Sequence, residues 1–512
     1  MKSIAGAKSR VLSPIAGLLV IIALFVVAKV FFLFRYHVPG WDEAVYLAMG
    51  KYIYSGGASG IWEMIRPVGL PVFLGWIWKL GLPYILFAEI ISIIFGIATI
   101  AASYLLAKKL FSGKVAVLAA TLLATSPAFY YYSSNIFTEI PSTFFAVMAT
   151  YLFISKRYYL AGALAAAATL FKFPHAILVF VLAAAFLAAS LARNRPFNLF
   201  LPWKQLFPLA KAFSTFAIVT SPFLIFNYLQ YRPYVGNAFA AVFRPFILGA
   251  WHQHNPAKTV AGMFYSYTFY AMEALKQHLL FVFILPAAWL FFRKKWFRDN
   301  GKLILGLFLA IYLAYFSYIP NKDSRFILLF LPAVCIFASA AFFESFDYLK
   351  TRAKLVAVLA ATALLALSFY LALLQDFSFY HWRPPSEPPI VPELYRSISR
   401  LGITGPVSTS EPVFAYYNNN RYFPYYDSSK GIPKDLKPSN EWEQGKPVEA
   451  VVYSPQTLYC KEADAECEAA KERLFSLIRS SYVQVLNATY YNSMTYYIFV
   501  NSSMHSSTSS LS

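Results

Sequence analysis

A succession of apolar runs, each close to the thickness of a bilayer, constrains this chain more than any other feature. A helix needs about 20 mostly apolar residues to cross the hydrocarbon core. Eleven runs approach or reach that length: 14–34, 84–107, 115–133, 136–155, 158–172, 174–192, 208–229, 278–292, 303–319, 326–345 and 353–374. With 59% hydrophobic and 13% charged residues, the chain is predicted to be an α-helical polytopic membrane protein with about 11 transmembrane helices.

Basic residues mark every second loop between these runs. They are Lys108, Lys109 and Lys114; Lys156 and Arg157; Arg193, Arg195 and Lys204; Arg293, Lys294, Lys295, Arg298 and Lys302; and Lys350, Arg352 and Lys354. Because Lys and Arg concentrate in cytoplasmic loops, the pattern places the N-terminus in the cytoplasm and the C-terminal region outside. It also explains the net charge of +20 without a nucleic acid. The short loops and the lack of a retrieval signal favour a cell membrane.

The composition divides the chain into four parts. Residues 1–375 are predicted to form the transmembrane domain, with two interfacial helices in the first outer loop, 35–83. Residues 376–392 are Pro-rich and are predicted to be a linker. Residues 393–501 alternate strand and helix patterns, which predicts a small extracytoplasmic α/β domain. The Ser-rich end, 502–512, is predicted to be disordered.

Some outer segments carry more detailed predictions. The long segment 230–277 is apolar and aromatic, and it is predicted to re-enter the membrane or to line a cavity. Cys460 and Cys467 could pair if the tail is extracytoplasmic. The tail is predicted to contain strands at 407–409, 448–453, 482–486 and 495–500 and helices at 411–419 and 463–480.

Two adjacent carboxylates, Asp42 and Glu43, stand where the chain leaves the first apolar run. Pro39 and Gly40 stop one element, and Asp42 is a suitable N-cap for an amphipathic helix over 43–54. Capping alone would account for these side chains. Carboxylates at a membrane edge can also perform acid–base or metal chemistry on a substrate held in lipid.

Further ionisable residues gather at the predicted outer ends of the spans. With the first two carboxylates, the set is Asp42, Glu43, Glu63, Arg66, Glu139, Lys172, His175, Lys322, Asp323 and Arg325. Charges at a membrane edge are costly, so each needs a partner or a function. Singly they have structural explanations: Glu139 suits a helix N-terminus, Lys172 can reach the interface, and His175 suits a core. Together they place acids and cations on one face of the membrane.

This mixture suits a sugar carried on a polyprenyl phosphate, whose lipid lies in the bilayer and whose phosphate lies at its edge. Transfer of the sugar needs a carboxylate that removes a proton from the acceptor hydroxyl. It also needs cations, or a carboxylate-bound metal, that hold the leaving phosphate. Carboxylates are supplied by Asp42, Glu43 and Glu139, and cations by Arg66, Lys172, Lys322 and Arg325.

The arrangement resembles the GT-C superfamily of polyprenyl-phosphate-sugar glycosyltransferases, in particular its protein O-mannosyltransferase and aminoarabinose transferase branch. The motifs that carry the resemblance are Trp41-Asp42-Glu43-Ala44, the stretch 63–71 with Glu63, Arg66 and Pro67, Thr138-Glu139-Ile140-Pro141, Phe171-Lys172-Phe173, and Asn321-Lys322-Asp323-Ser324-Arg325-Phe326. Asn321 stands where some relatives have His, and Asp323 where they have Glu. The Trp-Trp-Asp signature of oligosaccharyltransferases is absent, which argues against transfer of a whole oligosaccharide to Asn.

The resemblance implies an inverting transfer from a polyprenyl or dolichyl-type phosphate to a hydroxyl of a protein, lipid or glycan acceptor. It implies Asp42 as the general base, Glu43 and Glu139 as assisting carboxylates, and Lys172 and Arg325 as cations for the lipid phosphate. Metal dependence differs among such enzymes, so a divalent metal (Mg, Mn or Zn) on Asp42 and Glu139 stays open. Two alternatives also remain: a transporter or lipid flippase, and a non-catalytic scaffold whose outer domain binds a partner.

Overall fold

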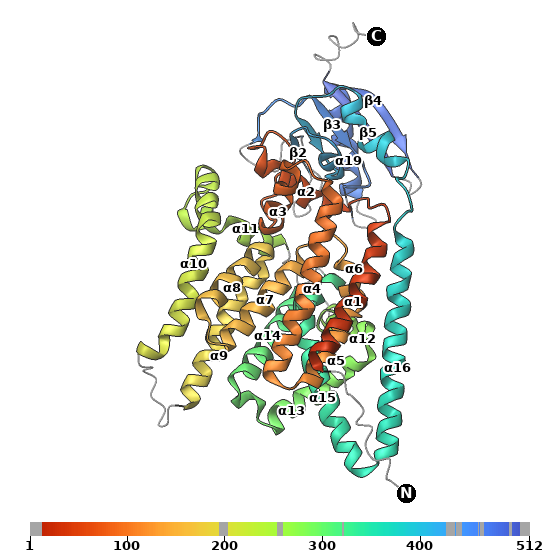
Figure 1. The fold of residues 1–512 in the computed structure, drawn as a ribbon. Helices are drawn as coiled ribbons and strands as arrows, with labels where there is room; N and C mark the ends of the chain where they lie inside the picture. The colour runs from red at the N-terminus through yellow and green to blue at the C-terminus, as the bar shows by residue number, and fades with distance from the viewer. Residues whose placement is uncertain are drawn as a thin grey trace.

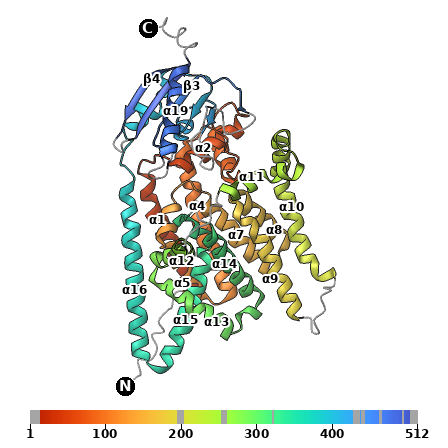
Figure 2. The same cartoon turned by 180° about the vertical axis from the view of Figure 1, so that it is seen from behind.

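The computed structural model describes residues 13–193, 203–252, 260–319, 322–425, 436, 443–458, 460, 465–490 and 494–501. Long helices form most of the molecule, and a small sheet covers one end of them (Figures 1 and 2). We call this end the sheet side and the other end the opposite side.

Helices account for all eleven predicted apolar runs. They are α1 (Pro14–Leu33), α4 (Tyr84–Leu110), α5 (Gly113–Ala124) with α6 (Pro127–Tyr132), α7 (Glu139–Ile154), α8 (Tyr158–Phe171), α9 (Ile177–Arg193), α10 (Trp203–Tyr231), α13 (Ile284–Arg293), α14 (Asn300–Tyr318), α15 (Leu331–Arg352) and α16 (Lys354–Phe379). Six of the described helices are long and apolar enough to cross a membrane alone. The predicted run 115–133 is interrupted before Pro127, which suits the first position of a helix because it has no N–H to leave unpaired. The predicted helical membrane fold is confirmed.

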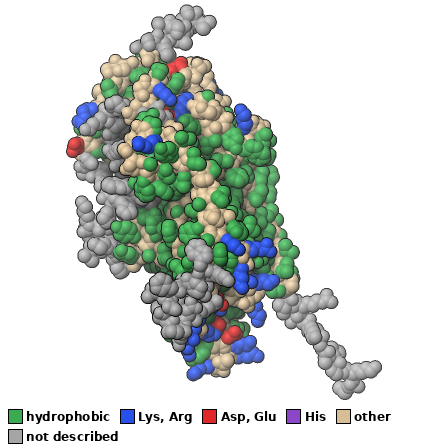
Figure 3. All heavy atoms as spheres, turned by 90° about the vertical axis from the view of Figure 1, so that its left-hand side faces the viewer, with side chains coloured by type: hydrophobic (Ala, Val, Ile, Leu, Met, Phe, Trp, Pro, Cys, Tyr) green, Lys and Arg blue, Asp and Glu red, His purple; other side chains and the backbone are tan. Residues whose placement is uncertain are grey.

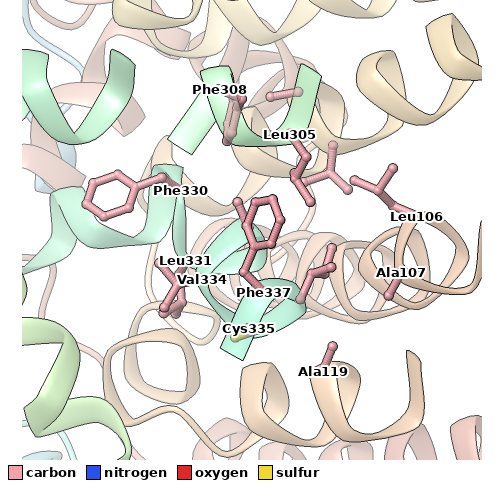
Figure 4. Close-up of a cluster of buried hydrophobic side chains, with 14 of the residues drawn as sticks. Leu106, Ala107, Ala119, Leu305, Phe308, Phe330, Leu331, Val334, Cys335 and Phe337 are labelled. Atoms are coloured by element: carbon pink, nitrogen blue, oxygen red, sulfur yellow. The ribbon is translucent and has the colours of Figure 1, made fainter. Parts of the chain in front are cut away.

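The core of the helical layer forms around α15, whose residues from Leu331 to Phe342 are all buried. Figure 4 shows Cys335 and Phe337 of this helix among side chains from α4, α5 and α14. On the face in Figure 3, hydrophobic side chains form a broad continuous area, and Lys and Arg gather mainly below it. An apolar exterior of this kind is expected where lipid, rather than water, is the solvent.

Two shorter helices, α2 (Trp41–Tyr54) and α3 (Gly69–Lys79), lie between the spans and the sheet. The predicted N-cap, Asp42, is wrong: Gly40 is the N-cap, and the helix begins at Trp41. Glu43 accepts the Gly40 N–H at 2.8 Å, so Asp42 is not needed at the cap. The two helices touch through glycines, because a Cβ on Gly50 would lie 2.6 Å from the Gly75 nitrogen.

The predicted segment 230–277 is mostly helical where it is described. It contains α11 (Ala238–His252) and α12 (Val260–Gln277), and 253–259 lie outside the described residues. The α11 helix folds back along α10, where Asn227 Nδ2 donates to the Val242 carbonyl at 3.0 Å.

The C-terminal sheet has the strand order β2-β1-β3-β5-β4. Its strands are β1 (Val407–Thr409), β2 (Tyr422–Pro424), β3 (Ala450–Tyr453), β4 (Tyr482–Thr489) and β5 (Thr495–Asn501), with helices α17 (Ser397–Arg400), α18 (Val413–Tyr417) and α19 (Ala465–Ser481). The first three strands are parallel, and β5 is antiparallel to both β3 and β4. Cys460 and Cys467 form a disulfide. Strand β2 was not foreseen from the sequence.

The sheet and α2 share one hydrophobic core. Ala44, Val45, Ala48 and Met49 of α2 pack with Val407, Ala450 and Ile498 of the sheet. The backbone of Gly60 extends the sheet, accepting from Tyr422 N at 2.8 Å and donating to the Asn420 carbonyl at 2.9 Å. The sheet is therefore fixed to the segment that carries the first two carboxylates.

Candidate active site

The first turn of α2 directs Asp42 toward two arginines from distant loops. Asp42 Oδ1 lies 2.6 Å from Arg66 Nη2, and Oδ2 lies 2.5 Å from Arg325 Nη1. Burial alone would raise the pKa of this carboxyl, but the two guanidinium groups hold the pKa well below its usual range. Asp42 is therefore ionised, with an arginine on each oxygen.

Arg325 connects Asp42 to further acids. Its Nε lies 2.7 Å from Asp323 Oδ2 and 3.6 Å from Glu139 Oε1. The Glu139 carboxylate is buried at the first position of α7 and receives the Lys172 ammonium at 2.7 Å. Lys172 thus pairs with an acid instead of extending to the interface.

Arg66 closes the other end of this charged network, with its Nε 3.0 Å from Glu63 Oε2. The phenol of Tyr46 lies beside it, since the Arg66 guanidinium is 5.7 Å from the ring centre. Seven of the ten predicted site residues are therefore brought together: Asp42, Glu63, Arg66, Glu139, Lys172, Asp323 and Arg325. We call these seven the charged network.

Glu43 lies in a different, buried cluster. Its Oε2 lies 3.1 Å from His37 Nε2, and its Oε1 accepts from the Ile136 backbone N–H at 2.8 Å. His37 Nδ1 lies 2.7 Å from Glu89 Oε1, which also pairs with Arg383. Both oxygens of Glu43 thus help to position α2 and the loop before α7, and its role as an assisting carboxylate stays a prediction.

His37 gives this cluster a pH dependence. Burial alone would lower its pKa, but the carboxylates of Glu43 and Glu89 raise it to about 8. Because this folded value exceeds the unfolded value of 6.5, the contribution to stability is complete below pH 6.5. It is lost as pH rises through about 8, and it amounts to about 2 kcal/mol.

We expect the thermal unfolding midpoint of the detergent-solubilised protein to fall between pH 6.5 and about pH 8.5, and this fall to shrink in His37→Gln. Glutamine keeps a hydrogen-bonding side chain but does not titrate. Exposed His381 provides the control His381→Gln, which should retain the slope. An equal slope in wild type and His37→Gln would contradict the assignment.

The two remaining predicted residues lie apart from the charged network. Lys322 donates to the carbonyls of Phe316 and Ser317 at 2.7 and 2.8 Å, so it caps the end of α14. His175 is fully buried in the helical layer, with Nδ1 2.7 Å from the Tyr312 hydroxyl. Among the described residues, no side-chain hydrogen bond or ion pair joins either of them to the network, although the His175 backbone N–H donates to the Lys172 carbonyl at 3.0 Å. Asn321 lies outside the described residues.

Sequence reasoning missed the cluster around His37. The signal for Glu89 was present, because a lone carboxylate inside an apolar run demands a partner. Lys29 and Asp376 are similar lone charges in α1 and α16, and both are buried. Arg383 was hidden in a Pro-rich stretch; its Nη2 donates to Ser134 O at 2.7 Å.

Comparisons with known proteins point in one direction. Residues 67–226 match the sequence model of a family described as dolichyl-phosphate-mannose-protein mannosyltransferase. ArnT from Cupriavidus metallidurans bound to undecaprenyl phosphate aligns with a TM-score of 0.61 and 15% identity, over 94% of this chain and 97% of that one. The archaeal oligosaccharyltransferase AglB from Archaeoglobus fulgidus, in complex with an inhibitory peptide and a dolichol-phosphate, aligns with a TM-score of 0.58 and 14% identity, over 93% and 74%.

The chain has the GT-C fold. The resemblance found in the sequence is thereby confirmed, and the chain is a multi-pass membrane protein. No curated protein sequence matches it. At these identities the solved structures establish the fold of this chain, and its chemistry rests on its own residues.

A divalent metal on Asp42 and Glu139 does not fit the arrangement of the charged network. Both Asp42 oxygens pair with guanidinium groups, Glu139 Oε1 pairs with Lys172, and Arg325 lies between the two carboxylates. Within the described ranges, no three His, Cys, Asp or Glu side chains form a metal-binding group. An AglB structure in complex with Zn and sulfate aligns with a TM-score of 0.50 and 17% identity, over 93% of this chain and 73% of that one.

Proposed function

We propose that this protein is a membrane glycosyltransferase. It moves a sugar from a polyprenyl or dolichyl-type phosphate to a hydroxyl of a protein, lipid or glycan acceptor, on the sheet side, which faces the exterior. The observation that carries the proposal is Asp42 held between Arg66 and Arg325. A base and two phosphate-binding cations meet there at the end of a bundle of spans. The two similar structures were determined with undecaprenyl phosphate and with dolichol-phosphate, which supports this donor class.

The proposed step is an inverting displacement. The acceptor oxygen forms a bond to the anomeric carbon of the sugar while the bond from that carbon to the phosphate oxygen breaks. The phosphate leaves with the electron pair, and the acceptor proton passes to Asp42. Arg66 and Arg325 hold the charge that develops on the phosphate, because planar guanidinium groups match phosphate oxygens in pairs.

The network must rearrange when the donor binds. It contains four carboxylates and three cations, so it has no spare positive charge for a phosphate. The phosphate therefore competes with Asp42 for the two arginines. Once they turn to the phosphate, the oxygens of Asp42 are released and its pKa rises toward the ordinary value. Donor binding thus frees Asp42 to act as the base. We therefore expect the donor to bind before the acceptor.

The test uses the purified full chain with a panel of polyprenyl-phosphate sugars and short acceptors bearing hydroxyl groups. Mass spectrometry should detect consumption of at least one donor, with equal release of polyprenyl phosphate and glycosylated acceptor. Retained donor across the panel, together with no saturable binding of undecaprenyl or dolichyl phosphate, would overturn the proposal. The transporter and scaffold alternatives have no specific observation in their favour among the described residues.

A further inference from the structure

A hollow lies on the sheet side, away from the charged network. It has a volume of about 270 Å³ and is lined by Tyr36, Lys51, Trp78, Tyr84, Arg396, Tyr416 and Tyr417. Five of these seven side chains carry aromatic rings. Lys51 lies nine residues beyond Asp42 on α2, which places it about 14 Å further along the helix and half a turn around it. The hollow is therefore separate from the site of bond cleavage.

A buried lysine fixes one wall of the hollow. Lys51 Nζ donates to the carbonyls of Tyr416 and Asn418 at 2.5 and 2.9 Å and to Asn419 Oδ1 at 3.2 Å. These contacts hold the chain of the C-terminal region against α2. The rings of Tyr416 and Tyr417 pack edge to face, with centroids 4.6 Å apart. Burial of an ammonium group costs free energy. Here the buried ammonium of Lys51 positions the segment that carries the aromatic wall.

Polar groups are paired across the rim. Glu387 Oε1 accepts from the Tyr36 hydroxyl and from Arg396 Nη2, both at 2.6 Å, and Arg396 Nη1 lies 3.3 Å from Glu387 Oε2. The charge of Arg396 is thus compensated by Glu387, and the ammonium of Lys51 is occupied by carbonyl groups. The hollow therefore offers hydrogen-bonding groups and aromatic rings, and of its two cations Arg396 is paired with a carboxylate.

The geometry points to a saccharide-binding pocket that holds one neutral sugar ring of a glycan on the acceptor side. The C–H faces of a sugar ring lie against aromatic rings, and its hydroxyls form hydrogen bonds with paired polar groups. Tyr and Trp side chains suit both kinds of contact, because they are apolar at one end and polar at the other. The volume is below the ~300–1,000 Å³ of drug-sized sites, which suits one ring rather than a whole oligosaccharide. This inference depends on the proposed function in one respect: the glycan that the pocket binds is taken to be the acceptor.

The test measures binding, not transfer. The Asp42→Asn protein in lipid nanodiscs is titrated with maltose, cellobiose, mannobiose and chitobiose, and binding is followed by saturation-transfer difference NMR. We expect saturable binding of at least one disaccharide, weakened at least about 10-fold by Trp78→Ala. The matched control is Trp76→Ala, on the same helix but 56% exposed and outside the lining; it should bind as the parent does. Glu387→Gln, at the rim, should weaken binding without removing a ring.

Two results would overturn the assignment of this hollow as a saccharide-binding pocket. One is the absence of saturable binding for all four disaccharides, and the other is binding that Trp78→Ala and Glu387→Gln leave unchanged. Glycerol phosphate is included as a probe, and its tighter binding would assign the pocket to a lipid headgroup instead. Failure of the transferase assay leaves these measurements intact, so the two proposals fail separately.

Discussion

Asp42→Asn should reduce the turnover of sugar transfer at least about 1,000-fold, within the range that general base catalysis contributes. Asparagine keeps the size of the side chain but cannot accept the acceptor proton. The protein should remain folded, because Arg66 keeps Glu63 and Arg325 keeps Asp323 and Glu139. Single-turnover transfer of a radiolabelled sugar measures the loss, and the thermal midpoint checks the fold.

The same variant should bind polyprenyl phosphate more tightly, by about 10-fold. Its two arginines no longer hold a competing carboxylate, and one pair of charge-assisted hydrogen bonds is worth about 1.5–3 kcal/mol. Glu344→Gln serves as the control, since Glu344 pairs with Lys294 between α15 and the end of α13. That variant should retain both activity and affinity. A folded Asp42→Asn protein with more than a tenth of wild-type turnover would refute Asp42 as the base.

Arg325→Lys should lower kcat/KM about 100-fold, mostly through weaker donor binding. The guanidinium reaches Asp42 through Nη1 and Asp323 through Nε. A lysine carries the same charge on a single nitrogen. It lacks the planar guanidinium that lets Arg325 contact Asp42 and Asp323 at the same time. Donor titration should show a higher KM, and the affinity for polyprenyl phosphate should fall in parallel.

Arg325→Met tests stability at the same position. The side chain of Arg325 is only 18% exposed, and its removal leaves Asp42, Asp323 and Glu139 with too few cations. We expect a loss of about 3–5 kcal/mol in the free energy of unfolding.

Arg298→Lys, at an exposed arginine between α13 and α14, is the control and should behave as wild type. An Arg325→Lys protein with wild-type donor affinity would remove Arg325 from the phosphate site.

The sequence was sufficient for the helical architecture because apolar length and loop charge are local signals. It also identified most of the charged network, since acids and cations at the ends of spans are individually costly. It could not reveal how they pair. Asp42 and Arg325 are 283 residues apart, and only tertiary packing decides that Asp42 faces the arginines while its neighbour Glu43 faces His37.

Errors in detail have similar causes. Asp42 was predicted as an N-cap from residue preference, yet the helix starts two residues earlier, with Gly40 as the cap and Glu43 as its partner. Lys322 and His175 were grouped with the site by position along the chain. The structure places Lys322 at the end of α14 and His175 in the helical core, and their role in substrate binding stays a prediction. Glu89 and Arg383 neutralise each other across 294 residues, a relation that no local pattern encodes.

The core that α2 shares with the sheet imposes a delay on biosynthesis. The partner of Lys51 at Ala415 is 364 residues further along the chain, so at about 5–20 residues per second the ribosome needs about 20–70 s to make it. Throughout that interval the apolar side of α2, with Val45 and Met49, has no sheet to cover it. The newly made helix must therefore lie on the bilayer surface or bind a chaperone. In a chain truncated after the last span, the sheet would never cover it.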